Sequence, residues 1–458
     1  MPSRSGILRC LAISATCLLA PWCFAEEAQI QEPWAPNCVL QVSERMGQVL
    51  GEKDIDRTAP IRDTILKTEI FGLGHTTGKI NIDFVPCEQA AIIDLVMNAE
   101  TISQTIGYRR LVQAHTIGHT TIYGRKRIYI DASGIRFDPA WSWNWPVPLN
   151  QYLTTQLRSP CLDQVVRNIA ERGSKRKEEK FRAILRSHIE ERTDRNFNED
   201  SDPGLMEANR SFQSTLRRLA GGRELMPDRL LLKTSDTEIF LLARMSDDPA
   251  APKQEAPPLT GQPGIALRLH ESWLEAAANR MFAGKTETAE TMRQEIINQL
   301  GPVKRPQPKE TEDDRQSLAI TFANSRPVEF HFADNTAAMV IHANEFRLQS
   351  RTLEGMDITA SYKLEKTETG LRFTRLGDLK IVPRDYTPGK RLSASQMTIR
   401  ALLQRVLGDV FQEVMELDEI PVPSMFPRVG KLLPTQVQTA NGWLVLSVSR
   451  EKPKAEKP

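Results

Sequence analysis

The clearest pattern in the chain is a run of apolar residues at helical spacing between residues 395 and 415. They recur there three or four positions apart, with charged and polar residues between them. Such a stripe predicts an amphipathic helix that buries one face. The preceding segment, 317–381, instead alternates apolar with polar residues, as at Val328, Phe330 and Phe332. That period of two predicts antiparallel strands with one buried face, on which the helix would lie.

The same order of elements occurs twice along the chain. Each half is predicted to open with a strand and a short helix, to continue as an antiparallel meander, and to end with a helix and a hairpin. The halves are 38–245 and 265–450, and 246–264 between them is rich in Pro and Ala, as linkers are. We therefore predict an α+β fold with two tandem similar domains, each a curved antiparallel meander packed on a long amphipathic helix, and a charged tail at 451–458. The alternative is that the two halves have different folds and only contain the same kinds of helices and strands in the same order.

The helical part of the first half is predicted at 149–219. Its apolar residues form several short faces, separated by polar segments near Gly173 and at 196–204. Because such interruptions end helices, we expect two or three helices there rather than one rod. Residues 172–182 carry six basic side chains, which suit either anionic head groups or a solvated helix face.

Three tryptophans lie directly before this helical region. Trp141, Trp143 and Trp145 occupy alternate positions, so in a strand they would share one face. Exposed, they would form a platform for a membrane interface or a ligand. The alternative, which residue type favours, is that they pack under the helix expected to begin near Leu149.

The first 25 residues have the pattern of an export signal. Arg4 and Arg9 precede an apolar run at 10–20, and small residues end at Ala25. We therefore expect a signal peptide cleaved near Ala25 and an exported protein, periplasmic or extracellular. The apolar run is shorter than the roughly 20 residues that cross a bilayer, and no later stretch is apolar enough, so we expect no transmembrane helix.

Cleavage would leave a chain with balanced charge. The two arginines of the signal segment would be lost, which leaves 58 basic and 58 acidic side chains. A neutral chain argues against nucleic acid as the main partner. Cys38, Cys87 and Cys161 would remain, enough for one disulfide and one thiol, and the sequence leaves their pairing open. We find no metal-binding or cofactor motif.

Histidines are the only candidates for catalysis, and their spacing does not favour it. His115 and His119 would share one face of a strand about 13 Å apart, too far for one metal ion. His331 and His342 would lie on facing strands near Glu329, on a face expected to be solvated. A hydrolase that uses His115 or His331 is therefore the least favoured of our hypotheses, and we expect no catalytic site.

The predicted layout of residues 38–450 resembles the tubular lipid-binding superfamily, which includes bactericidal permeability-increasing protein and its lipid-transfer relatives. The resemblance lies in two meanders, each wrapped on a long helix, in an exported chain. It implies that each sheet curls around its helix and leaves an apolar seam that holds acyl chains.

A seam between sheet and helix would be lined by two groups of residues that face each other. They are Ile93, Leu95 and Met97 on the sheet and Leu403, Val406, Leu407 and Phe411 on the helix. An acyl chain there would contribute about 0.8 kcal/mol per buried methylene, although the same faces could close as a dry core. Our first hypothesis is an exported, non-enzymatic protein that binds a lipid or other apolar ligand in this seam, with peripheral membrane contact. The alternative is a structural or interaction protein of the cell envelope with fully packed cores.

Overall fold

The computed structural model describes residues 34–157, 160–221, 226–246, 252, 254–288, 291, 318–348, 351–384, 386–387, 389–408, 410–417 and 431–451. The expected signal peptide, part of the expected linker and most of the expected tail lie outside the described residues. The described part of the chain is rich in strands, with far fewer residues in helices. The strands form several antiparallel sheets beside a long helix, which makes this an α+β protein.

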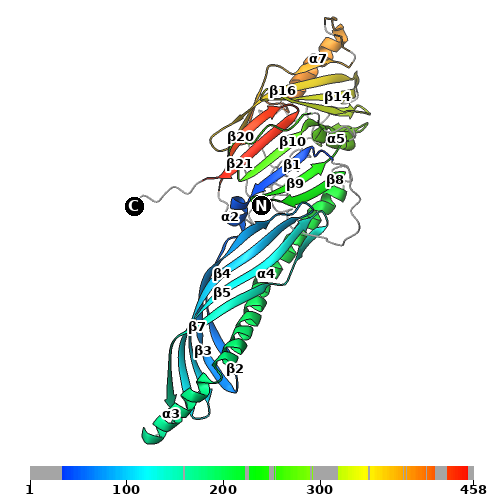
Figure 1. Cartoon of the computed structure of the whole chain (residues 1–458). Helices are drawn as coiled ribbons and strands as arrows, with labels where there is room; N and C mark the ends of the chain where they lie inside the picture. The colour runs from blue at the N-terminus through cyan, green and yellow to red at the C-terminus, as the bar shows by residue number, and fades with distance from the viewer. Residues whose placement is uncertain are drawn as a thin grey trace.

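A six-stranded sheet occupies the middle of an elongated molecule (Figure 1). In spatial order its strands are β20 (Leu432–Ala440), β21 (Trp443–Arg450), β10 (Ile265–His270), β1 (Cys38–Ser43), β9 (Glu238–Arg244) and β8 (Arg229–Thr234). Strands β1 and β10 pair at its centre, and the two expected closing hairpins, β8–β9 and β20–β21, lie outside them. This central sheet therefore takes three strands from each predicted half of the chain.

A second sheet, the long sheet, is built from the first half alone. Its strands are β2 (Lys53–Ile65), β3 (Thr68–Val85), β4 (Ala91–Arg109), β5 (Val112–Asp131), β6 (Gly134–Phe137) and β7 (Trp141–Thr155). Both β6 and β7 pair with β5, at different ends of that strand, and β7 contains Pro146 and Pro148. The short helix α2 (Glu44–Gly51) joins β1 to this sheet, and Ser43 caps it by accepting a hydrogen bond from the Met46 N–H.

Two helices follow β7, and they differ from the prediction. α3 (Pro160–Lys175) and α4 (Glu178–Gly221) are separated near the expected break, but α4 continues through Pro203. Contacts of its middle part with the sheet offset the proline, because Phe197 and Leu205 are buried there. No helix begins at Leu149, since that residue belongs to β7. α4 runs along the long sheet from the far end toward the central sheet (Figure 1).

The second half forms the third sheet. Its strands are β11 (Thr286–Thr288), β12 (Leu318–Phe322), β13 (Val328–Ala333), β14 (Thr336–Leu348), β15 (Arg351–Glu354), β16 (Met356–Lys366), β17 (Leu371–Arg375), β18 (Lys380–Pro383) and β19 (Val414–Leu417). Its helices are α5 (Glu271–Phe282) and α7 (Ala394–Gly408). α7 is shorter than predicted, because Val414 and Met415 belong to β19 and pair with β17.

Two of the three cysteines expected in the mature chain have described side chains. Cys38 lies in β1, and the backbone of Cys87 forms an isolated β-bridge with Thr234, the last residue of β8. The two cysteines are not bonded to each other. The side chain of Cys161 lies outside the described part of the chain.

Candidate functional site

The structure places the predicted seam residues in separate parts of the molecule. Ile93 and Leu95 belong to a core cluster between the long sheet, α2 and the central sheet, and Met97 lies in a small cluster with Phe197 of α4. The helix group belongs to the core of the third sheet. The members of that group are Leu403, Val406, Leu407 and Phe411. Because the two groups contact different neighbours, they do not face each other across one seam.

The protein fills the space around most of these residues. Leu95 and Val406 are half-buried, whereas the other five predicted seam residues are buried by neighbouring side chains. A buried side chain in a well-packed cluster leaves little room for a ligand. These positions therefore have the packing of core residues.

The apolar residues of α4 are covered unevenly along its length. From the middle of the helix onward, Phe197, Leu205 and Phe212 are buried. Near its start, at 181–189, the large apolar side chains are only half-buried. These residues are Phe181, Ile184, Leu185 and Ile189. We name this stretch the α4 seam, because the helix there keeps apolar surface that the protein itself does not fully cover.

The long sheet offers small side chains to this part of α4. Ser142 Oγ and Asn144 Nδ2 of β7 donate hydrogen bonds to the carbonyl oxygens of Glu190 and Arg186, so these positions mark the face toward the helix. Pairing register places Gly, Ala, Ser and Thr on the same face of the middle strands. They are Gly74, Thr76, Gly78, Ala99, Thr101, Ser103, Gly118 and Thr120. Side chains this small fill little of the space between a helix and a sheet.

The backbone of β4 leaves no room for a side chain at two positions of β3, Gly72 and Gly78. A Cβ built on Gly78 would lie 2.3 Å from the carbonyl oxygen of Asn98 and 2.6 Å from the Ala99 Cα. The neighbouring backbone therefore approaches too closely for any side chain.

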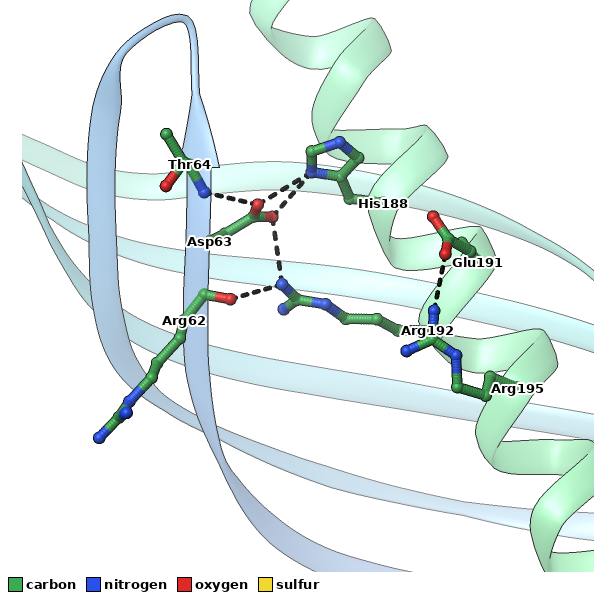
Figure 2. A network of polar contacts seen from close by, with 7 residues as sticks. All are labelled: Arg62, Asp63, Thr64, His188, Glu191, Arg192 and Arg195. Carbon is green, nitrogen blue, oxygen red and sulfur yellow. Dashed lines mark hydrogen bonds and ion pairs between the residues drawn. The ribbon is translucent and has the colours of Figure 1, made fainter.

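A network of polar contacts joins the β2 edge of the sheet to α4 (Figure 2). The carboxylate of Asp63 accepts hydrogen bonds from the Thr64 N–H at 2.7 Å and from His188 Nδ1 at 2.9 Å. Arg192 lies 3.6 Å from the same carboxylate and donates to the carbonyl oxygen of Arg62. Asp63 is only 10% exposed, so these contacts form a partly desolvated clamp. We name it the β2 clamp.

Further along α4, a buried lysine holds the helix to β5. The ammonium of Lys126 is fully buried, forms an ion pair with Asp202 and donates a hydrogen bond to Asn198 Oδ1 at 2.6 Å. It also lies 4.8 Å from the centre of the Phe137 ring. The middle of α4 is thus fixed to the sheet, in contrast to the α4 seam.

The three tryptophans are exposed, so the interpretation that they pack under a helix is wrong. Trp141, Trp143 and Trp145 are 55%, 43% and 52% exposed. The reason is the alternation of β7, in which Ser142 and Asn144 take the side that α4 covers. The rings of Trp143 and Trp145 stack with centroids 6.0 Å apart.

More apolar residues share this outer face of the long sheet, and the sequence reasoning missed them. Register places them on the same side as the tryptophans, and each is exposed. They are Phe71, Leu73, Ile102, Tyr108, Ile117, Tyr123, Val147 and Tyr152. The available signal was the alternation of large residues with glycine in β3, as in Phe71-Gly72-Leu73-Gly74.

The histidines named in the sequence analysis lie beside carboxylates or against an aromatic ring. His342 Nδ1 lies 2.8 Å from Asp357, and its Nε2 lies 3.7 Å from Glu329, which is also 4.0 Å from His331. His115 stacks on Tyr152 with ring centroids 4.7 Å apart. Within the described residues, no group of three or more His, Cys, Asp and Glu side chains is arranged to hold a metal ion.

Two hollows lie elsewhere on the molecule. One, of about 390 Å³, is lined mainly by polar residues that include Asn344, Glu354 and Arg384. The other, of about 430 Å³, lies beside Tyr129 and Arg136. Neither is lined by residues of the α4 seam or of the outer face.

Comparison with known proteins identifies no family for this chain. No family model matches it, and no curated protein matches it either. Among solved structures, it is similar to a crystal structure of lipopolysaccharide binding protein, with 8% identity and a TM-score of 0.29 over 92% of this chain and 100% of that one. It is also similar to P47 from Clostridium botulinum A2, with 9% identity and a TM-score of 0.22 over 90% of this chain and 97% of that one. In the described part of the chain, we find no helix with the length and apolar character needed to cross a membrane.

Proposed function

We propose that this is an exported, non-enzymatic protein that binds a lipid or other apolar chain along the α4 seam. The observation that carries the proposal is the half-buried apolar side of α4 at 181–189, opposite strands with small side chains. An acyl chain between them would cover Leu185 and Ile189 and would occupy space that Gly, Ser and Thr leave. Export would follow from the signal segment at residues 1–25.

The binding energy of such a ligand would come from burial of its methylenes. Burial of ten methylenes contributes about 8 kcal/mol, and this gross gain must exceed the loss of translational and conformational freedom on binding. A chain of that length extends roughly 12 Å, whereas the nine residues from Phe181 to Ile189 rise by about 12 Å along the helix. The α4 seam is therefore long enough for a large part of one acyl chain.

We also propose that the two halves, 38–245 and 265–450, are similar repeats. Each begins with a strand at the centre of the central sheet, continues into a short helix and a meander, and ends with a hairpin at the side of that sheet. In the second half, however, Leu403 and Leu407 of the helix are buried. The ligand site is for this reason assigned to the first half alone.

The test is the lipid content of the purified protein. Protein purified without detergent is expected to yield lipid on organic extraction and a ligand-bound mass in native mass spectrometry. The double variant Leu185→Asp/Ile189→Asp is expected to lose most of that lipid, because a charge in an apolar seam is costly to desolvate. Ser187→Asp, on the exposed side of the same helix, is the matched control and should keep it.

Lipid-free wild-type protein would contradict this function. It would favour the second candidate, an interaction protein of the cell envelope, for which the exposed outer face of the long sheet is the specific observation. Far-ultraviolet circular dichroism of the variants distinguishes a loss of lipid caused by the altered seam from a loss caused by unfolding.

A further inference from the structure

The polarity of the long sheet is inverted over its outer half. In an antiparallel sheet that packs on a helix, apolar residues usually face the helix and polar residues face water. Here the middle strands turn mostly Gly, Ala, Ser and Thr toward α4, with Ile70 and Ile122 among them, and carry most of their large apolar residues on the opposite face. The outer face is therefore more stable in contact with surroundings that are less polar than water.

Register shows that this face is continuous across the strands. Phe71, Ile106, His115 and Tyr152 form one cross-strand row on β3, β4, β5 and β7. His75, Ile102, His119 and Val147 form another row. Two further rows, closer to the central sheet, end on tryptophans: Asn98, Tyr123 and Trp143, and Val96, Arg125 and Trp141. From Trp141 to Tyr152 the face extends for about 36 Å at 3.3 Å per residue.

The charges around the face suit an anionic surface. From Gln113 to Arg127 and from Trp141 to Tyr152, the outward residues of β5 and β7 include no carboxylate. Arg125 is exposed beside Trp141, and the Arg186 guanidinium lies 4.9 Å from the centre of the Trp145 ring.

Carboxylates also lie on the neighbouring strands of this face. Asp94 of β4 lies 3.8 Å from Arg125 and 2.8 Å from Arg127, Glu100 lies 3.2 Å from His119, and Asp56 of β2 lies 3.7 Å from His75. Among the residues that the structure describes, Arg186 and the cations described next have no such carboxylate on this face.

Further exposed cations lie at the far end of the face, where the hairpins turn. They are Lys67, between β2 and β3, and Arg109 and Arg110, between β4 and β5. Leu111 is exposed next to them. Cations therefore stand at both ends of the apolar face.

Helix α3 adds exposed apolar residues near the end of β7. It packs against β7 and β5 at the far end of the molecule (Figure 1). Leu162, Val165 and Ile169 recur at helical spacing and are all exposed, and Arg172 follows one turn later. An amphipathic helix with a free apolar side and a cation is typical of a lipid interface.

We propose that the outer face of the long sheet, together with α3, docks on an anionic phospholipid surface. Trp and Tyr rings concentrate at membrane interfaces because they are apolar with one polar group, and interspersed His, Thr and Gln suit the head-group region better than a dry protein interface. Arg125, Arg186 and the cations at the hairpin turns would meet the lipid phosphates. This docking is separate from the uptake of a lipid at the α4 seam.

Vesicle flotation tests the proposal. The full-length mature protein is expected to float with phosphatidylcholine vesicles that contain 30% phosphatidylglycerol, and less with pure phosphatidylcholine. Trp141→Ser/Trp143→Ser/Trp145→Ser should weaken this binding at least tenfold, and Leu162→Ser/Ile169→Ser should weaken it as well. Met397→Ser, a comparably exposed apolar residue of α7, is the matched control and should bind like wild type.

Two results would overturn the proposal. One is wild-type protein that stays unbound at 30% phosphatidylglycerol, and the other is a triple tryptophan variant that floats as well as wild type. A different pair of results would assign the face to self-association. In that case wild type would not bind vesicles but would self-associate in sedimentation velocity, and the triple tryptophan variant would be monomeric.

The two proposals fail separately. The triple tryptophan variant should retain extractable lipid, because the α4 seam is unchanged, whereas Leu185→Asp/Ile189→Asp should still float.

Discussion

At the scale of single residues, two carboxylates of α5 accept the hydrogen bonds that a neighbouring strand would otherwise accept from the free edge of β13. Glu275 accepts a hydrogen bond from the Phe330 N–H at 3.1 Å, and Glu271 accepts one from the Phe332 N–H at 3.2 Å. Those N–H groups lie on alternate residues of β13, so one helix face satisfies the strand's free edge. Burial raises the pKa of Glu275 above its usual range, the Phe330 N–H opposes this, and the carboxylates of Glu271 and Glu329 add to it.

This raised pKa predicts a stability that falls as the pH rises. The folded state holds the Glu275 proton more tightly than the unfolded state, so its contribution is complete below the ordinary glutamate pKa and is lost as pH rises through the folded value. The slope is at most about 1.4 kcal/mol per pH unit for one proton. Glu275→Gln should be more stable than wild type at pH 7, with a difference that shrinks toward pH 4, in urea titrations.

The control for that titration is Glu368→Gln, on an exposed turn of the same sheet. It should leave the pH dependence as it is in wild type. An unchanged pH slope in Glu275→Gln would show that other groups cause the dependence.

At the scale of elements, α4 touches both borders of the long sheet. β7 contributes Ser142 and Asn144 on one side, and the β2 clamp of Asp63, His188 and Arg192 closes the other (Figure 2). The clamp is polar and lies beside the α4 seam, so its strength determines how firmly β2 is held against the helix.

Asp63→Ala is expected to loosen β2 without unfolding the sheet. Loss of a carboxylate acceptor shared by a histidine and an arginine costs about 1.5–3 kcal/mol. Hydrogen–deuterium exchange should accelerate in β2, at 53–65, and remain unchanged in β4 and β5. Asp56→Ala, on the exposed side of the same strand, should have no such effect. Equal exchange in Asp63→Ala and wild type would show that the clamp does not hold the strand.

At the scale of the whole molecule, the central sheet makes the two halves depend on each other. β1 pairs with β10 from Val42↔Ile265 to Cys38↔Leu269, and the outer hairpins pair only with strands of their own half. Separation of the halves would therefore expose the backbone groups of both central strands.

Division of the chain tests this dependence. A fragment of residues 34–246 is expected to aggregate or to melt well below the full-length protein, and co-expression with 254–451 should restore a soluble complex. Size-exclusion chromatography and thermal melts measure both outcomes. A monomeric 34–246 fragment as stable as the intact protein would show that β1 does not need β10.

Local sequence patterns predicted many of the helices and strands. They could not predict contacts between residues that are far apart in the sequence. The alternation at Val328, Phe330 and Phe332 correctly predicted a strand, since a period of two depends on neighbours alone. The orientation of Trp143 did not follow from sequence, because the covered side of β7 depends on the position of α4. Asp63 and His188 lie 125 residues apart, so no local pattern joins them.

Pro146 and Pro148 of β7 affect how the protein behaves at high concentration. β7 borders the long sheet, and prolines in such strands direct their missing N–H toward solvent. An extended segment of a second molecule therefore finds no continuous row of donors along this border. The growth of fibrils by addition of strands is blocked at this border, although the exposed apolar outer face lies directly beside it.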